Sequence, residues 1–192
     1  MQGGHVLIAV AVLDQIQFQL LHQLRDGEIQ LDGLGCIHSN SQILAMQADP
    51  KSEGLSYVLE ATEKIAIRLD SGQLVEQELL AQQSLLRSGQ RPLEVNVAIP
   101  DVVLTGSRYD IDLIVEEPLG QALVAGGLID LTDDQLSAQM RPNLPLAPQG
   151  GGGLFKSVLA PQQPGSQTWA VMLVHPDGVV TATKRVRVVS RH

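Results

Sequence analysis

The stretch TWAVMLVHPDGVVTATKRVRVV, residues 168–189, decides the fold class of this 192-residue chain. Thr168–Val174 is apolar almost throughout, which is typical of a strand covered on both faces. His175-Pro176-Asp177-Gly178 predicts a turn in which proline presets φ and glycine is expected at positive φ. The residues after it predict a partner strand, Val179–Val189, with one apolar face made of Val180, Ala182, Val186 and Val188. We therefore interpret this stretch as a β-hairpin.

The segment before the hairpin repeats the same pattern in shorter pieces. Apolar side chains alternate with polar ones in Leu93–Ile99 and again in Arg108–Val115, which predicts two half-buried strands. The turn residues Pro100-Asp101 end the first of them, and Thr105-Gly106-Ser107 precedes the second. Leu119–Leu131 is a third apolar segment, interrupted by Gly126-Gly127. A Pro/Gly-rich stretch, Arg141–Gly153, predicts a long loop, followed by a strand that starts near Leu154.

About a hundred residues, Arg91–Val189, resemble an immunoglobulin-like or fibronectin-III-like sandwich. LEVNVAIPDVVLTGSRYDIDLIV (residues 93–115) is similar to the first two strands of such modules in bacterial proteins, and PGSQTWAVMLVHPDGVVTATKRVRV (residues 164–188) to the last two. The chain departs from antibody domains in lacking their cysteine pair and in placing Trp169 in the penultimate strand. The resemblance implies an architecture and little biochemistry, because this fold carries many functions.

The first ninety residues predict a smaller mixed α/β or β region. Arg87–Pro92 is polar, contains Gly and Pro, and separates two expected domains, residues 1–90 and 91–192. His5–Leu13 predicts a buried strand, and Asp14–Leu24 fits either a strand or, by preference, a helix capped by Asp14. The remaining expectations are short strands at Ile29–Leu34 and Ser41–Met46, a hairpin at Ile65–Val75 turning at Asp70-Ser71-Gly72, and a strand or short helix at Leu79–Leu86. The expected fold class is therefore mainly β, with the mixed region preceding a C-terminal antiparallel sandwich.

Several motifs approach catalytic or metal-binding patterns and fail on spacing or context. QGGGGLFKS (residues 149–157) places Phe155 where a phosphate-binding loop needs glycine, and Pro161 cuts off the helix that such a loop requires. Asp130, Thr132, Asp133 and Asp134 lack the glycine and bidentate glutamate of a calcium-binding EF-hand, and Thr132 with Gln135 instead predicts a helix cap. Cys36 and His38 are too few ligands for zinc. We accordingly expect no catalytic, cofactor-binding or metal-binding residues.

Composition narrows the range of partners. The formal net charge of −8 opposes non-specific binding to nucleic acid or anionic lipid, and an aromatic content of 3% provides few stacking platforms for bases. The longest early apolar run is too short to insert into a membrane, and no signal-peptide pattern precedes it. As written the chain is therefore expected in the cytoplasm, and a missing leader would relocate it to the periplasm or a lumen.

The basic residues near the C-terminus form the one candidate interaction site, made of Lys184, Arg185, Arg187 and Arg191. Arg185, Arg187 and Arg191 share one face of the expected strand. They are interpreted either as a patch for an acidic partner, such as Glu116-Glu117 or Asp133-Asp134 of another copy, or as a solvated face that discourages edge pairing. The expected function is non-enzymatic: interaction with another protein, self-association or structural assembly. The alternative is a regulatory module that binds a small molecule or an ion, with a site between the halves or in the Arg141–Gly153 loop.

Overall fold

The computed structural model describes residues 36–43, 56–70, 73–89, 91, 93–116, 122–137, 143–150 and 152–190. These residues form two β-sheets and one short helix, α2 (Asp133–Ser137), which is too short to cross a membrane. The larger sheet contains β1 (Cys36–Ile43), β2 (Ser56–Asp70), β3 (Gln73–Gly89), β5 (Val102–Leu104), β7 (Val124–Leu131), β8 (Ala147–Gln149), β10 (Gly165–His175) and β11 (Gly178–Val189). The smaller sheet contains β4 (Val95–Ala98), β6 (Arg108–Val115) and β9 (Gly153–Leu159).

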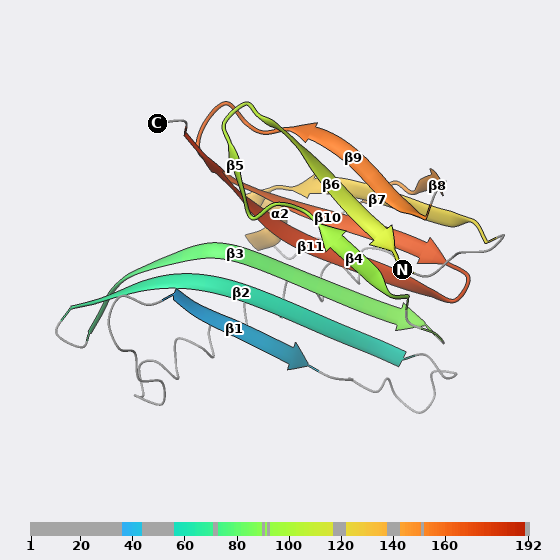
Figure 1. Ribbon diagram of the computed structural model, residues 1–192, viewed down its shortest axis with the longest axis horizontal. Coiled ribbons are helices and arrows are strands. Elements are labelled where there is room, and N and C mark those ends of the chain that lie inside the picture. The colour runs from blue at the N-terminus through green and yellow to red at the C-terminus, as the bar shows by residue number, and fades with distance from the viewer. Residues whose placement is uncertain are drawn as a thin grey trace.

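The strand order of the larger sheet is β1-β2-β3-β11-β10-β7-β8, with β5 beside the end of β11, and that of the smaller sheet is β4-β6-β9. All strand pairs are antiparallel except β5 with β11. The smaller sheet lies in front of β11, β10 and β7, whereas β1, β2 and β3 extend the larger sheet to one side (Figure 1). The prediction of a mainly β chain with a C-terminal antiparallel sandwich is confirmed.

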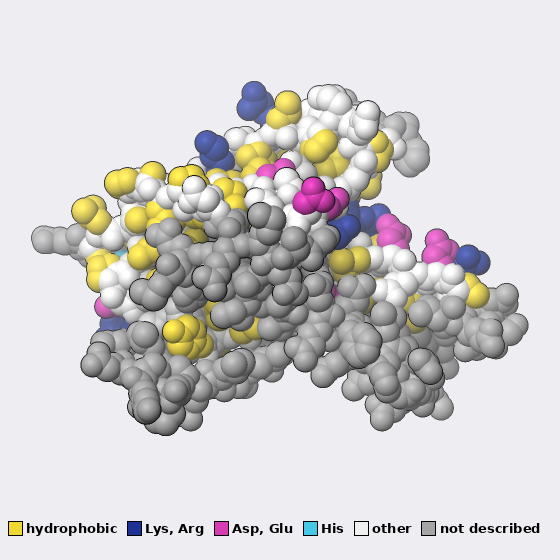
Figure 2. Space-filling model, turned by 180° about the vertical axis from the view of Figure 1, so that it is seen from behind, with side chains coloured by type: hydrophobic (Ala, Val, Ile, Leu, Met, Phe, Trp, Pro, Cys, Tyr) yellow, Lys and Arg dark blue, Asp and Glu magenta, His cyan; other side chains and the backbone are white. Residues whose placement is uncertain are grey.

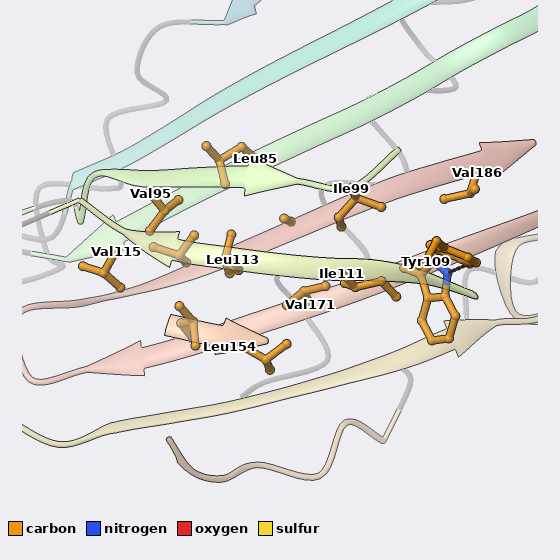
Figure 3. Close-up of a cluster of buried hydrophobic side chains, with 14 of the residues drawn as sticks. Leu85, Val95, Ile99, Tyr109, Ile111, Leu113, Val115, Leu154, Val171 and Val186 are labelled. Carbon is orange, nitrogen blue, oxygen red and sulfur yellow. Dashed lines mark hydrogen bonds between the residues drawn. The ribbon is translucent and has the colours of Figure 1, made fainter. Parts of the chain in front are cut away.

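The two sheets share one apolar core. Ile111 and Leu113 of β6 are completely buried in one cluster with Val171 and Leu173 of β10. Ile111 lies next to Val171 in this core (Figure 3). Branched aliphatic side chains dominate it because the sequence offers few aromatics, and their burial is the main favourable contribution to folding. Two of the aromatics are joined by a hydrogen bond, in which Trp169 Nε1 donates to the Tyr109 hydroxyl at 2.7 Å. The indole can therefore be buried with its donor satisfied.

The C-terminal hairpin forms as predicted, with one correction at its turn. β10 pairs with β11 from Gly165 opposite Val188 to His175 opposite Gly178, and the residues predicted for the apolar face are almost fully buried. The expectation of a positive φ at Gly178 was wrong, since the glycines with positive φ are Gly89, Gly106 and Gly152 in the described part of the chain. Gly178 is instead required by proximity, because a Cβ there would overlap the backbone oxygen of Ser88 in β3.

The strands before residue 90 continue the larger sheet. β2 and β3 form the predicted hairpin, with Leu69 opposite Leu74, and the ambiguous segment Leu79–Leu86 lies within β3. β3 in turn pairs with β11, so the sheet crosses the expected boundary between residues 1–90 and 91–192. The division into two folding units stays a prediction. The expectations for His5–Leu13, Asp14–Leu24 and Ile29–Leu34 lie outside the described residues.

Candidate functional site

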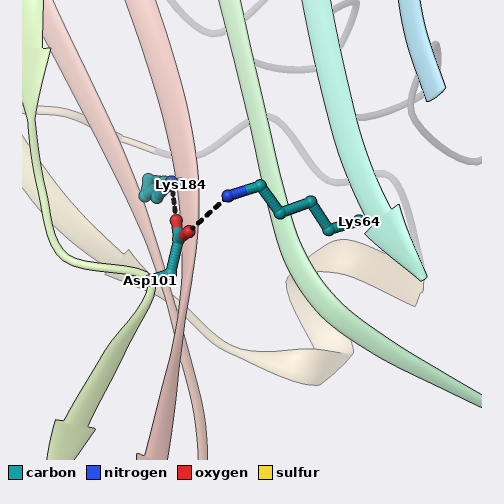
Figure 4. Close-up of polar contacts among 3 residues, drawn as sticks. All are labelled: Lys64, Asp101 and Lys184. Atoms are coloured by element: carbon teal, nitrogen blue, oxygen red, sulfur yellow. Dashed lines mark hydrogen bonds and ion pairs between the residues drawn. The ribbon is translucent and has the colours of Figure 1, made fainter. Parts of the chain in front are cut away.

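The predicted basic cluster is divided between ion pairs within the chain. Lys184 is buried, and its ammonium group contacts the carboxylate of Asp101, which also pairs with Lys64 at 3.2 Å (Figure 4). Burial by itself raises the pKa of Asp101, but the hydrogen bonds and charges of the two lysines outweigh this effect and hold the pKa below its ordinary value. Lys184 therefore ties β11 to the loop that follows β4.

Of the other members of the cluster, the structure describes Arg185 and Arg187, which lie on the opposite face of β11 from the buried Lys184. Arg187 pairs with Glu78 of β3 at 2.7 Å, Arg185 is half-buried, and Arg191 lies outside the described residues. The interpretation of these charges as guards of a sheet edge was wrong, because β11 is flanked by β3 and β5 on one side and by β10 on the other. The interpretation of these residues as a patch for an acidic partner in another copy stays a prediction.

The residues around α2 are organised by a helix cap. Thr132 and Gln135 make the predicted capping box, with backbone-to-side-chain distances of 3.0 and 3.2 Å. Burial raises the pKa of the neighbouring Asp130, whose carboxylate accepts a hydrogen bond from Gln167 Nε2 at 3.0 Å. In the described part of the chain, no three or more His, Cys, Asp or Glu side chains are grouped so that they could hold a metal ion.

The feature that the sequence did not reveal as a site is β9, which begins at Gly153 in the Gly-rich stretch that resembles a phosphate loop. Gly152 has a φ of +84°, which the chain needs to turn from β8 into β9. Leu154 is buried in the core, and the chain continues from it as the extended strand β9, which contains Lys156 and Ser157. In this geometry they cannot form the N-terminus of a phosphate-binding helix.

β9 is one of the two edge strands of the smaller sheet, and β4 is the other. β9 pairs with β6, and no other strand of the described residues pairs with its outer edge. Hydrogen bonds at the two ends of this pairing, Val115 N to Gly152 O and Ala160 N to Ser107 O, each measure 2.8 Å. Gly152 and Ala160 flank β9 and are both even-numbered. Because the register between them is continuous, the even residues of β9 direct their peptide groups toward β6. The odd residues Phe155, Ser157 and Leu159 therefore direct theirs outward.

The side chains of these odd residues are also accessible. Phe155 and Leu159 are 54% and 55% exposed, although both are large and apolar. The three odd residues lie opposite charged residues of β6, namely Asp112, Asp110 and Arg108. Phe155 and Leu159 therefore have charged neighbours on the side of β9 that faces β6. We call Phe155, Lys156, Ser157, Val158 and Leu159, with the outward peptide groups of the odd residues, the β9 edge.

Lys156 is the charged member of the β9 edge. It lies two residues from Leu154 and from Val158, so its side chain is on the same, core-facing side of the strand. It is nevertheless exposed, because β9 is at the edge of its sheet. Within the described residues it makes no ion pair. On the face shown in Figure 2, basic and acidic side chains lie next to one another toward the right-hand end, whereas two basic side chains stand apart at the upper edge. Among the described residues, Lys156 is thus a cation without an ion-pair partner, and it lies beside the outward peptide groups of the odd residues.

Comparison with known proteins places this edge inside a family domain. A sequence model of the family described as "Domain of unknown function (DUF8623)" matches residues 90–189, which include every strand from β4 to β11. No curated protein matches the chain. The matched segment spans more than half of the sequence, so the chain belongs to the DUF8623 family.

Proposed function

We propose that this protein is a non-enzymatic protein-binding module that accepts an extended segment of a partner along the β9 edge. The observation that carries the proposal is the coincidence of outward peptide groups with two exposed apolar side chains on one edge strand. In strand addition, main-chain hydrogen bonds provide affinity, and alternate side chains provide selectivity. The resemblance of residues 91–189 to immunoglobulin-like modules fits this role, because such sandwiches offer sheet edges to partners.

The proline variant Ser157→Pro tests the proposal directly. The peptide N–H of Ser157 points away from β6, so proline removes an outward donor while leaving the β6–β9 ladder intact. The control Ser157→Thr keeps the donor. A library of displayed extended peptides is selected on the wild-type protein and then counter-screened on both variants.

We expect the selected peptides to bind the wild type and Ser157→Thr but not Ser157→Pro. Should the proline variant unfold, the double variant Phe155→Ser/Leu159→Ser takes its place, since both side chains already face solvent. Peptides that bind all the folded variants equally, or a library that yields no binder, would rule out the β9 edge as the site.

A further inference from the structure

The position of Lys156 specifies the chemistry of the partner segment, provided that the segment binds the β9 edge as proposed. An added antiparallel strand forms hydrogen-bonded pairs with Phe155, Ser157 and Leu159, because the peptide groups of these residues point outward. The partner residues opposite them then lie on the outer surface of the smaller sheet. The partner residue opposite Lys156 lies on the other side, next to the ammonium group.

We infer that the partner segment carries an acidic residue opposite Lys156, between apolar residues that face Phe155 and Leu159. Directly opposite side chains on neighbouring strands have Cβ atoms about 5 Å apart, close enough for a carboxylate to pair with a lysine. Lys156 makes no ion pair within the described residues, so this carboxylate would supply the partner that the chain does not.

The residues on either side complete the pattern. Phe155 and Leu159 are more than half exposed, and apolar residues opposite them would remove this surface from water. Ser157 lies between them and leaves room for a small side chain. Read in its own direction, the antiparallel partner is therefore apolar opposite Leu159, small opposite Ser157, acidic opposite Lys156 and apolar opposite Phe155.

A second copy of this chain fits the edge less well. In one antiparallel register, the Phe155 of each copy lies opposite the Leu159 of the other. Each Lys156 then lies opposite the apolar Val158, and the two lysines are diagonal neighbours across the interface. The register centred on Lys156 sets the two ammonium groups against each other. An inward-side lysine on an edge strand is a common device against self-pairing, and the net charge of −8 on each copy adds to the repulsion.

Three labelled peptides test the inference: GTLVTEITG and its matched forms GTLVTQITG and GTLVTKITG. In each, Leu, Thr and Ile are placed to face Leu159, Ser157 and Phe155, and the variable residue faces Lys156. Fluorescence anisotropy with the full chain measures their affinities. We expect the glutamate peptide to bind about fivefold more tightly than the lysine peptide at low salt, and the difference to shrink at 1 M salt. The variant Lys156→Glu should reverse the order.

The outcomes separate the two proposals. Equal binding of the three peptides, lost in Ser157→Pro, overturns the acidic partner and leaves strand addition intact. Failure of all three to bind at millimolar concentration counts against both. Sedimentation velocity measures the oligomeric state of the wild type and of Ser157→Pro. A wild-type dimer that becomes a monomer in Ser157→Pro would mean that a second copy binds the β9 edge, and this result would also overturn the acidic partner.

Discussion

Removing the carboxylate charge of Asp101 should destabilise the protein by far more than a surface substitution does. Asp101 contacts Lys184 of β11 and Lys64 of β2, and its backbone oxygen accepts a hydrogen bond from Arg187 N at 2.9 Å. The variant Asp101→Asn keeps the size and the backbone contact but leaves the Lys184 ammonium group without a counter-charge. The side chain of Lys184 is 8% exposed, so water compensates only in part for the lost carboxylate.

The magnitude follows from the burial of the two partners. Breaking a buried ion pair by removing one charge costs about 3–5 kcal/mol, whereas an exposed pair contributes about 0–1 kcal/mol. The Asp101 side chain is 35% exposed, which places this pair between the two limits. We therefore expect Asp101→Asn to lower the free energy of unfolding by about 2–3 kcal/mol. Lys64 is 42% exposed, and Lys64→Met should cost less than about 1 kcal/mol.

The effect also has a defined pH dependence. The pKa of Asp101 is lowered in the folded protein, so its ionised form contributes stability that is present above the unfolded pKa and is lost as the pH falls through the folded pKa. The difference in free energy of unfolding between the wild type and Asp101→Asn should thus be constant above about pH 5 and should become smaller below about pH 4.

Urea unfolding followed by the fluorescence of Trp169, the single tryptophan, measures these free energies. A double-mutant cycle with Lys184→Met isolates the pair, and Asp110→Asn on the exposed face of β6 is the matched control, expected to change stability by less than about 0.5 kcal/mol. If Asp101→Asn costs the same in the Lys184→Met background as in the wild type, the two charges are not coupled and the reasoning is wrong.

Two further substitutions test the packing of the sandwich. Gly127→Ala should cost about 1–3 kcal/mol because its Cβ would overlap a backbone oxygen, whereas the control Gly165→Ala has open space and should be near neutral in the same urea experiment. Tyr109→Phe should cost about 1–3 kcal/mol, since it leaves the buried Trp169 Nε1 donor without its acceptor; a stability equal to wild type would show that water replaces the hydroxyl.

Local patterns predicted the elements that depend on local sequence. The hairpin of residues 168–189, the strand Arg108–Val115 and the capping box at Thr132 were predicted because alternation and turn residues are visible in a few consecutive positions. Leu79–Leu86 stayed ambiguous because it fits both periods, and its pairing with β11 arises about a hundred residues later in the chain.

The candidate site was less predictable for the same reason. Lys184 lies on the same face of its strand as Ala182 and Val186, and this position could have indicated that its side chain is buried. Its partner Asp101, however, is 83 residues away in the sequence. Phe155 and Leu159 read as ordinary strand residues in the sequence. Only the sheet order shows that their strand has no neighbour on one side among the described residues.

The pairing of β3 with β11 has a practical consequence for anyone who expresses the family domain by itself. A fragment beginning at residue 90 would retain all the strands that the family model matches, but Gly178–Arg185 would lose the hydrogen-bonding partners supplied by Gln82–Gly89. The part of β11 that loses its neighbouring strand includes Val179–Thr183, which has no charged side chain to prevent pairing between molecules. Such a fragment should precipitate or recruit a substitute strand, and soluble protein is best sought by including the β2–β3 hairpin.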